Sequence, residues 1–391
     1  MNDTDALAAW VAKQALRSAN AMERAISATA LVRRRDAFGQ VVVPTAGSVL
    51  ASPVFADWDP EPDYFFHWVR DSAIVMRSVA ELMQDSASAA ERRRWRRHFE
   101  DFVRFSLALC SLDGAGFASA SRHRAATRRD FRRFLRSDSE LRGLAGDSLL
   151  GEPRFNPDGT LDFQRWSRPQ HDGPALRALA CLRYLAAGGV ASEALQRLLH
   201  VDLDFTLRHA GLRCIGSWEE VGENAHHYYV AVVQLGALVH GRDWIDDGGE
   251  RSAAEARLRA GLERHWSPHR GVYTAIRDMP GNAADDLVDA AQLLAVLDAD
   301  LPGGSHSAED PRVQATQAAI EALFAREFPI NRALPSGQGP ALGRSRGDRY
   351  FGGGAWYPTT LAAAGLCYRL ALSPGQDRDA LLRRGDGFMA T

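Results

Sequence analysis

A loop gives way to a helix within the stretch Trp-Ser-Arg-Pro-Gln-His-Asp-Gly-Pro-Ala-Leu-Arg, residues 166–177. Pro174 can occupy the first turn of a helix, where its missing N–H is not needed, and Asp172 lies near the helix N-terminus, which favours negative charge. We therefore expect a helix over about residues 174–187. Helix capping does not explain Trp166 and Arg168, which precede this turn.

Helical periodicity dominates the rest of the chain as well. In a helix expected over residues 5–29, apolar side chains such as Leu7 and Trp10 recur on one face. Residues 40–56 are rich in β-branched side chains and are broken by Gly47 and prolines, so they favour a short hairpin or an extended segment. Further helices are expected at about 70–84, 90–110, 192–210, 226–240, 251–265, 284–298, 312–327, 355–372 and 377–391.

The connections between these helices differ in length. Some are short, whereas residues 56–69, 138–173, 214–225 and 330–355 form long, aromatic and charged connections. Loops of that length are uncommon in compact domains unless they carry function. The pattern predicts a layered helical domain with its long loops on one rim. Because no repeat or low-complexity linker divides the sequence, we expect one domain over residues 1–391.

The composition is that of an ordinary globular protein: 391 residues, 46% hydrophobic and 25% charged, with a net charge of −2. This charge gives no electrostatic case for nucleic acid or membrane binding, and residues 92–97 are best interpreted as a solvated helix face. His171 and the pair His226-His227 lack further ligands at metal-binding spacing, as do the four cysteines. With no signal peptide or apolar run of about 18 residues in the sequence, we expect a cytoplasmic protein. Lys13 is the single lysine among 47 basic residues, which suggests a GC-rich, bacterial genome.

Two adjacent carboxylates follow an aromatic residue in Trp218-Glu219-Glu220-Val221. Neighbouring side chains diverge on a helix or a strand, so Glu219 and Glu220 should have separate tasks. A carboxyl held against an indole loses solvation, which raises its pKa and makes it a candidate general acid. The alternative is an ordinary pair of solvated glutamates.

Two further clusters combine aromatic rings with charges. Residues 62–72 read Pro-Asp-Tyr-Phe-Phe-His-Trp-Val-Arg-Asp-Ser, which suits a sugar site because rings stack on pyranose faces and charged groups hold hydroxyls. A helix start above a core of aromatic side chains explains the same residues. The second cluster, Arg344 with Asp348, Tyr350 and Trp356, fits either a functional loop or a surface turn followed by a core helix.

Taken together, these clusters resemble glycoside hydrolase family 15, the glucoamylase family, from about residue 5 to the end of the chain. The motifs that carry the resemblance are Pro-Asp-Tyr-Phe-Phe-His-Trp-Val-Arg-Asp at 62–71, Gly-Glu-Pro-Arg-Phe-Asn at 151–156, the stretch at 166–177 and Trp-Glu-Glu-Val at 218–221, extended by Gly-Arg at 343–344, Ala-Trp-Tyr at 355–357 and Thr-Leu-Ala-Ala-Ala at 360–364. The resemblance implies an all-α fold, an (α/α)6 barrel with a short β-hairpin or extended segment near the N-terminus. Its long loops would form a pocket for the non-reducing end of an α-glucan.

The resemblance also implies a role for each matched residue. Glu219 corresponds to the general acid and Glu220 to a carboxylate that contacts the substrate. Arg70 and Asp71 would hold the terminal glucose, Tyr64 would lie beside the developing cation, and the remaining substrate contacts would be Trp68, Trp166 and Arg344. The implied reaction is exo-acting, inverting hydrolysis by an α-glucosidase that needs a second carboxylate to activate water but no metal or cofactor. We expect Glu219 to lie in one pocket with Arg70, Asp71 and Trp166.

The sequence departs from the family pattern at two places. The family's general base lies in a Ser-Glu-Gln-like motif beyond the last matched helix, and the sequence ends at Thr391 before that motif. Glu223 is too close to Glu219 along the chain to replace the base, and Asp71 is assigned to binding. Gly216 stands where an acidic residue is common in the family. We therefore expect residues 1–391 to bind a glucose-like ligand but hydrolyse it poorly; the alternative is a catalytically silent glucan-binding or regulatory protein of the same fold.

Overall fold

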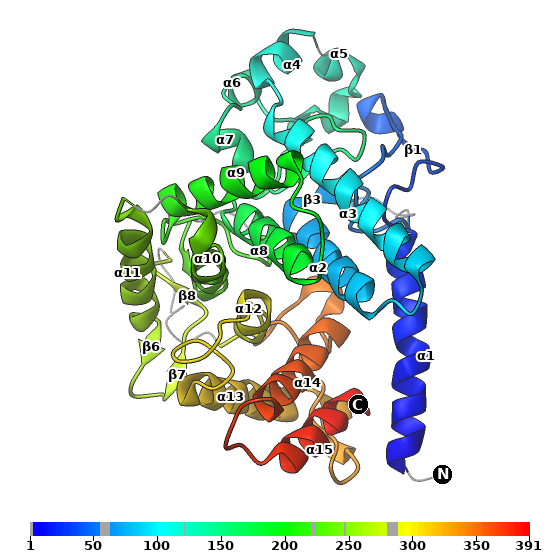
Figure 1. Cartoon of the computed structure of the whole chain (residues 1–391). Coiled ribbons are helices and arrows are strands. Elements are labelled where there is room, and N and C mark those ends of the chain that lie inside the picture. Colours follow the sequence, from blue (N-terminus) through cyan, green and yellow to red (C-terminus); the bar gives the residue numbers. More distant parts are fainter. Residues whose placement is uncertain (1–2, 55–62, 121, 221–223, 246–247, 280–287) are drawn as a thin grey trace. The chain divides into compact units, whose positions relative to one another are not determined.

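The computed structural model describes residues 3–54, 63–120, 122–220, 224–245, 248–279 and 288–391 (Figure 1). The chain divides into two compact units. The N-unit comprises Ala12–Arg208 with His240–Asp246, and the C-unit comprises Met1–Val11, His209–Val239 and Asp247–Thr391. The single domain expected over residues 1–391 stays a prediction.

The N-unit is mainly helical, as the sequence predicts (Figure 1). Its long helices are α2 (Val69–Asp85), α3 (Ala89–Cys110), α8 (Asp172–Ala186) and α9 (Glu193–His209), while α1 (Asp3–Glu23) has residues in both units. The shorter helical pieces are η1 (Asp36–Phe38), α4 (Gly114–Ala120), α5 (His123–Ala126), η2 (Arg129–Phe134), α6 (Asp138–Arg142), α7 (Asp147–Leu150) and η3 (Arg242–Trp244).

Within the N-unit, the helices α2 and α8 pack extensively against each other. On α2 the buried side chains, including Val69, Ala73 and Met76, recur every three or four residues and so form one apolar face. Most of α8 is buried, as its nearly continuous apolar sequence requires. One buried charge on α8 is Arg177, whose guanidinium donates to both carboxylate oxygens of Asp202 on α9 at 2.8 and 2.7 Å.

Short antiparallel strands fix the loops of the N-unit. The strand β1 (Arg33–Arg35) pairs with β2 (Gln40–Val42) across a turn at Gly39, which has a left-handed φ of 59°. A short hairpin does lie near the N-terminus, but it spans residues 33–42 rather than 40–56, and among the described residues of the expected segment only Gln40–Val42 forms a strand. Residues 55 and 56 of the expected segment 40–56 lie outside the described residues.

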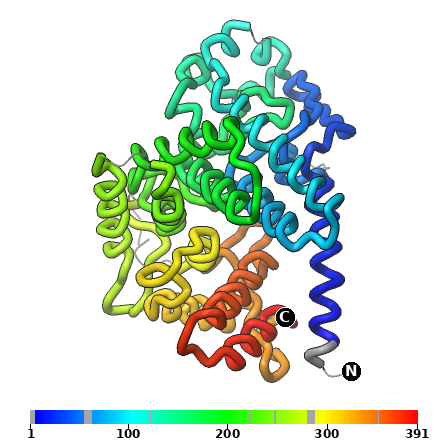
Figure 2. The backbone as a smooth tube through the Cα atoms, viewed as in Figure 1, coloured from blue at the N-terminus to red at the C-terminus, as the bar shows by residue number. Residues whose placement is uncertain are grey.

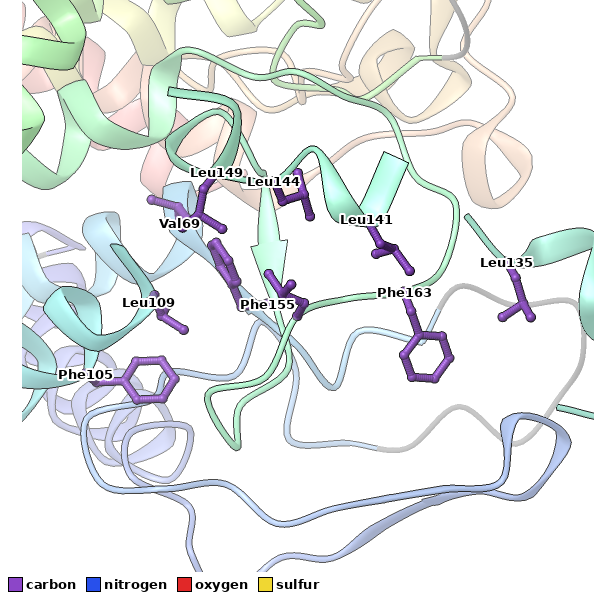
Figure 3. Packing of buried hydrophobic residues seen from close by; sticks show 10 residues of the cluster. Val69, Phe105, Leu109, Leu135, Leu141, Leu144, Leu149, Phe155 and Phe163 are labelled. Carbon is purple, nitrogen blue, oxygen red and sulfur yellow. The ribbon is translucent and has the colours of Figure 1, made fainter. Parts of the chain in front are cut away.

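A second strand pair brings two predicted motifs together. The strand β3 (His67–Trp68) pairs with β4 (Arg154–Phe155), so that Trp68 lies opposite Arg154. Figure 3 shows Phe155 of β4 within an apolar cluster that also includes Val69 of α2 and Leu109 of α3. Burial of these side chains holds β4 and its flanking loops against α2 and α3, and thereby sets the position of Trp68 and of the first turn of α2.

The C-unit is also mainly helical, and the path of its chain can be followed in Figure 2. Its helices are α10 (Tyr228–His240), α11 (Glu250–Glu263), α12 (Ala291–Ala299), α13 (Pro311–Glu327), η5 (Pro329–Ala333), η6 (Tyr350–Gly352), α14 (Tyr357–Ala371) and α15 (Arg378–Met389). The strands in the described part of the C-unit form two antiparallel pairs, β5 (His226–His227) with β8 (Ile276–Arg277), and β6 (Trp266–Ser267) with β7 (Val272–Tyr273).

In the C-unit, α14 packs closely against α15. A Cβ atom on Gly385 of α15 would lie 2.5 Å from the ring of Tyr368 on α14, so glycine is what allows this approach. The same tyrosine donates a hydrogen bond to Asp386 at 2.7 Å. Within the described part of the chain, no helix is both long enough and apolar enough to span a membrane.

Two helices are shorter than the sequence predicts. The helix expected over 5–29 ends at Glu23, because Ile26 forms an antiparallel bridge with Val49. The helix expected over 284–298 begins only at Ala291, whose N–H donates to the Asp289 carboxylate at 2.6 Å. Residues 284–287 lie outside the described residues.

Candidate functional site

The N-unit places Trp68, Arg70 and Asp71 where a strand turns into a helix. Trp68 ends β3 and is the N-cap of α2, while Arg70 and Asp71 lie in the first turn of that helix. The N–H of Val69 between them donates to Pro153 O at 2.9 Å, which ties this turn to the loop before β4. The local sequence therefore holds a charged pair at a helix start whose backbone is fixed on both sides.

Arg70 is fixed by the loop that precedes α8. Its Nη1 donates to Gln170 Oε1 at 2.8 Å and to Asp172 Oδ2 at 2.7 Å, and its Nε lies 4.0 Å from Asp71 Oδ2. The side chain of Asp172 is 1% exposed and that of Arg70 is 11% exposed, whereas that of Asp71 is 44% exposed. Asp71 is therefore the carboxylate of this group that a ligand can reach.

Aromatic rings adjoin this charged group. The ring centroids of Tyr64 and Trp68 lie 5.8 Å apart, and Trp68 lies 5.8 Å from Trp166 at an interplanar angle of 76°. Trp68 is buried, while Tyr64 and Trp166 keep part of their ring surface accessible. The N-unit thus brings together all five of its predicted substrate contacts. Pro62, the first residue of the motif, lies outside the described residues.

The C-unit collects the second group of predicted site residues around Arg344. Its Nε and Nη2 donate to the two carboxylate oxygens of Asp348 at 2.7 and 2.6 Å. The guanidinium carbon lies 5.4 Å from the Trp218 ring centroid, 4.6 Å from that of Tyr350 and 5.3 Å from that of Trp356. The buried guanidinium is therefore surrounded by π faces, which stabilise a cation.

Glu219 and Glu220 differ in their surroundings. Glu219 has a left-handed φ of 58° and donates its N–H to Gly216 O at 3.0 Å, which makes a tight turn. Glu219 is half-buried, whereas the side chain of Glu220 is 58% exposed and reaches to 3.9 Å from Arg344 Nη2. Separate tasks for these carboxylates are compatible with this geometry. Val221 and Glu223 lie outside the described residues.

Both glutamates line a cavity of about 320 Å3 that also contains Asp289. Asp289 is 5% exposed. Burial is the main cause that raises its pKa to about 7, and the negative charge of Glu220 adds to this, whereas a hydrogen bond from Ala291, the Trp218 side chain and the charge of Arg344 oppose it. Nothing in the sequence pattern marks this carboxyl as functional, because it lies inside the helix expected over 284–298.

The structure also gives a reason for the departure at Gly216. A Cβ atom at this position would lie 2.4 Å from Nδ1 of His227 on β5. The imidazole therefore excludes an acidic side chain at Gly216 unless it moves. Among the described residues, no group of three or more His, Cys, Asp or Glu side chains could hold a metal ion.

The predicted site residues thus form two groups, one in each unit. Tyr64, Trp68, Arg70, Asp71 and Trp166 belong to the N-unit, and Glu219, Glu220 and Arg344 to the C-unit. The expectation that Glu219 shares a pocket with Arg70, Asp71 and Trp166 stays a prediction.

Among curated proteins, the chain is similar to glucoamylases. Glucoamylase 1 of Rhizopus oryzae is 26% identical over 326 residues, which cover 79% of this chain and 48% of that protein. Glucoamylase-1 of Arthroderma benhamiae is 28% identical over 337 residues, which cover 82% of this chain and 48% of that protein. The chain therefore spans about half the length of these curated relatives, which are fungal; the bacterial origin and cytoplasmic location expected from the sequence stay predictions.

A solved structure shows the fold. The glycoside hydrolase family 15 glucoamylase from Hypocrea jecorina superposes with a TM-score of 0.69 at 21% identity, covering 89% of this chain and 60% of that one. This confirms the expected all-α, (α/α)6 fold. The family profile described as "Glycosyl hydrolases family 15" matches residues 37–384, so the chain belongs to that family.

Proposed function

We propose that the chain is an exo-acting, inverting α-glucosidase that releases glucose from the non-reducing ends of α-glucans. The observation that carries the proposal is the arrangement around Arg344, where a guanidinium fixed by Asp348 and by aromatic rings lies 3.9 Å from Glu220, the neighbour of Glu219. Membership of family 15, and glucoamylases among the relatives, support this class of reaction.

In this proposal, Glu219 is the general acid. It donates its proton to the glycosidic oxygen while the bond to the terminal glucose breaks, and water attacks the opposite face of the sugar with help from a second carboxylate. Positive charge develops on the glucose ring in the transition state, and the π face of Tyr64 can stabilise it. Arg344 would hold both Glu220 and the substrate in place through its charge.

The N-unit group supplies the expected chemistry for holding a terminal glucose. The exposed Asp71 carboxylate accepts hydrogen bonds from sugar hydroxyls, and the Arg70 guanidinium, fixed by Asp172, donates to them. Trp166 offers an accessible indole face on which the apolar face of a pyranose can stack. Charged groups that select hydroxyls and a ring that selects the sugar face together favour a saccharide over other small polar ligands.

The variant Glu219→Gln, made in a form of the protein that carries the family's general base, tests the proposal, because the amide keeps the shape of the side chain but has no proton to transfer. We expect kcat on maltose to fall by about 10²- to 10⁴-fold, with maltose binding largely retained in a fluorescence titration. The matched control is Glu193→Gln on α9, where the parent side chain is 88% exposed. A kcat for Glu219→Gln within about twofold of the parent would exclude Glu219 as the acid.

The same assay separates the proposal from its alternative, a catalytically silent glucan-binding protein. In that case the parent and Glu219→Gln, both in the form that carries the general base, would bind maltose equally and neither would release glucose. Parallel assays on maltose, isomaltose and trehalose would identify the linkage that the protein hydrolyses.

A further inference from the structure

Arg154 is a buried cation enclosed by three aromatic rings. It belongs to β4, is 1% exposed, and pairs with Trp68 across the β3–β4 ladder. Its guanidinium carbon lies 3.8 Å from the ring centroid of Trp166, 4.1 Å from that of Phe66 and 4.9 Å from that of Trp68. Two of these rings are the indoles of Trp68 and Trp166, which the family resemblance implies as substrate contacts, and the proposed function assigns sugar stacking to Trp166.

A carboxylate fixes the orientation of this guanidinium. Arg154 Nε donates to Asp162 Oδ2 at 2.8 Å, and Arg168, two residues after Trp166, donates to the same oxygen at 2.8 Å. Burial alone would raise the pKa of Asp162, but the charges of Arg154 and Arg168 outweigh it, so the pKa lies below its ordinary value. Arg168 also donates to Glu152 at 2.6 Å, so the arginine beneath the rings and the loop that carries Trp166 share one network of buried ion pairs.

Stability alone does not account for a cation in this position. Removing two charges from water is costly, and well-packed apolar side chains of similar volume often serve stability as well or better. A planar guanidinium does something that an apolar side chain cannot do: it attracts π faces and, through its hydrogen bonds, holds them in a fixed orientation. Arg154 is fixed by its hydrogen bond to Asp162, and it contacts both indoles and Phe66 from that fixed position.

The two indoles differ in how much of their ring surface is accessible to a ligand. Trp68 is 3% exposed and meets Trp166 edge to face, whereas Trp166 keeps accessible surface. Arg154 packs against the ring of Trp166 at 3.8 Å and so occupies one side of it. Only the remaining surface of Trp166 is left for a pyranose ring. The orientation of that surface depends on Arg154, which packs against the ring.

We propose that Arg154 is a positioning residue for sugar binding, which fixes the indoles of Trp68 and Trp166 from the side opposite to the ligand. This inference rests on the proposed function for its ligand. Because the arginine acts through the Trp166 ring, which would touch the sugar before and during the reaction alike, it should affect ground-state and transition-state binding equally. Loss of such uniform binding raises KM and leaves kcat unchanged.

The test compares Arg154→Met with Arg133→Met. The control removes another arginine–aromatic contact, at an exposed site where the Arg133 guanidinium lies 4.8 Å from the Phe134 ring centroid. For Arg154→Met we expect KM for maltose to rise about 30-fold, which corresponds to a desolvated cation–π contact, with kcat within about threefold of the parent. The near-UV circular dichroism and tryptophan emission of the ligand-free protein should also change, while Arg133→Met leaves all of these unchanged.

A double-mutant cycle with Trp166→Phe identifies the route of the effect. If Arg154 acts through the indole, Arg154→Met should raise KM much less in the Trp166→Phe background than in the parent. Additive effects on KM, or an unchanged tryptophan spectrum in Arg154→Met, would overturn the proposal. Should Arg154→Met not fold, Arg154→Lys answers the same question, since an ammonium cannot cover several ring faces as a planar guanidinium does; parent-like KM and spectrum would then overturn it.

The spectroscopic arm separates this inference from the proposed function. A parent protein that carries the family's general base and still releases no glucose from any α-glucan would contradict the proposed function. The ligand-free spectra of the Arg154 and Arg133 variants would still decide whether Arg154 orders the two indoles. If the parent is active and the spectra of Arg154→Met match those of the parent, only the positioning role fails.

Discussion

Arg344 and Asp348 form a two-point ion pair, in which Nε donates to Oδ2 at 2.7 Å and Nη2 donates to Oδ1 at 2.6 Å. These hydrogen bonds are the main cause that holds the pKa of Asp348 below its ordinary value of 3.8. A lowered carboxyl pKa means that the pair contributes stability above pH 3.8 and loses it as the pH falls through the lowered value. At neutral pH, Asp348 therefore fixes the guanidinium between the rings of Tyr350 and Trp356.

The first prediction follows from that pair. Asp348→Asn replaces a carboxylate oxygen with an NH2 group that faces the guanidinium, so Arg344 loses its fixed orientation. We expect kcat/KM on maltose to fall by about 10- to 100-fold, the range for a hydrogen bond between charged groups. Asp243→Asn, at a side chain that is 85% exposed, is the matched control. Parent-like kcat/KM in Asp348→Asn would mean that Arg344 does not need this partner.

The second prediction concerns the pH dependence of stability. The pKa of Asp289 is raised from 3.8 to about 7, mainly by burial, so the folded protein keeps a proton that the unfolded chain loses over this range. The contribution of Asp289 to stability is therefore fully present below pH 3.8 and is lost as the pH rises through about 7. Its loss amounts to at most about 1.4 kcal/mol per pH unit.

Asp289→Asn tests this sign, because the amide resembles the protonated carboxyl and can still accept from Ala291. We expect the variant to become more stable relative to the parent as the pH rises from about 4 to 7, as measured by the free energy of unfolding in urea. The buried His67, His265 and His306 have lowered pKa values, so they destabilise both proteins as the pH falls. The free energy of unfolding of the variant minus that of the parent is therefore the quantity to plot against pH. A difference independent of pH would show that Asp289 titrates normally.

The third prediction concerns the buried pair between α8 and α9. Asp202→Ala leaves the Arg177 charge buried without its carboxylate, so we expect a loss of about 3–5 kcal/mol in the free energy of unfolding. The double variant Arg177→Met with Asp202→Leu removes both charges and should be more stable than Asp202→Ala alone. Urea titrations of the three proteins check this order. A double variant less stable than the single one would mean that the pair is required for packing.

Helix positions could be predicted from the sequence because periodicity reports which face of a helix is buried. The helices α2, α8 and α14 lie within two residues of their expected ends. The surroundings of Arg154 and Asp289 could not be predicted in this way. Each depends on which side chains meet across distant segments, as when Arg154 contacts both Trp68 and Trp166. Composition and spacing carry no information on such meetings, so these residues became evident only from packing.

The family motifs predicted more of the site than periodicity did, because their spacing implies which loops carry polar and aromatic groups. Tyr64, Trp68 and Trp166 do adjoin one another, and Arg344 does meet Glu220. The motifs identified Gly216 only as a departure, and the position of the His227 ring supplies its physical reason.

The last prediction tests that reason. Gly216→Ala would bring a Cβ atom to 2.4 Å from His227 Nδ1, and overpacking of this kind typically costs about 1–3 kcal/mol. The matched control is Gly261→Ala in α11, where no heavy atom lies within 4 Å of the added Cβ, so the free energy of unfolding should rise by roughly 0.5–1 kcal/mol through helix propensity.

His227→Ala removes the imidazole, so Gly216→Ala should cost little in that background. A double-mutant cycle of urea unfolding free energies isolates the clash from any other contact that His227 makes. If Gly216→Ala costs the same with and without the imidazole, His227 is not what requires glycine at this position.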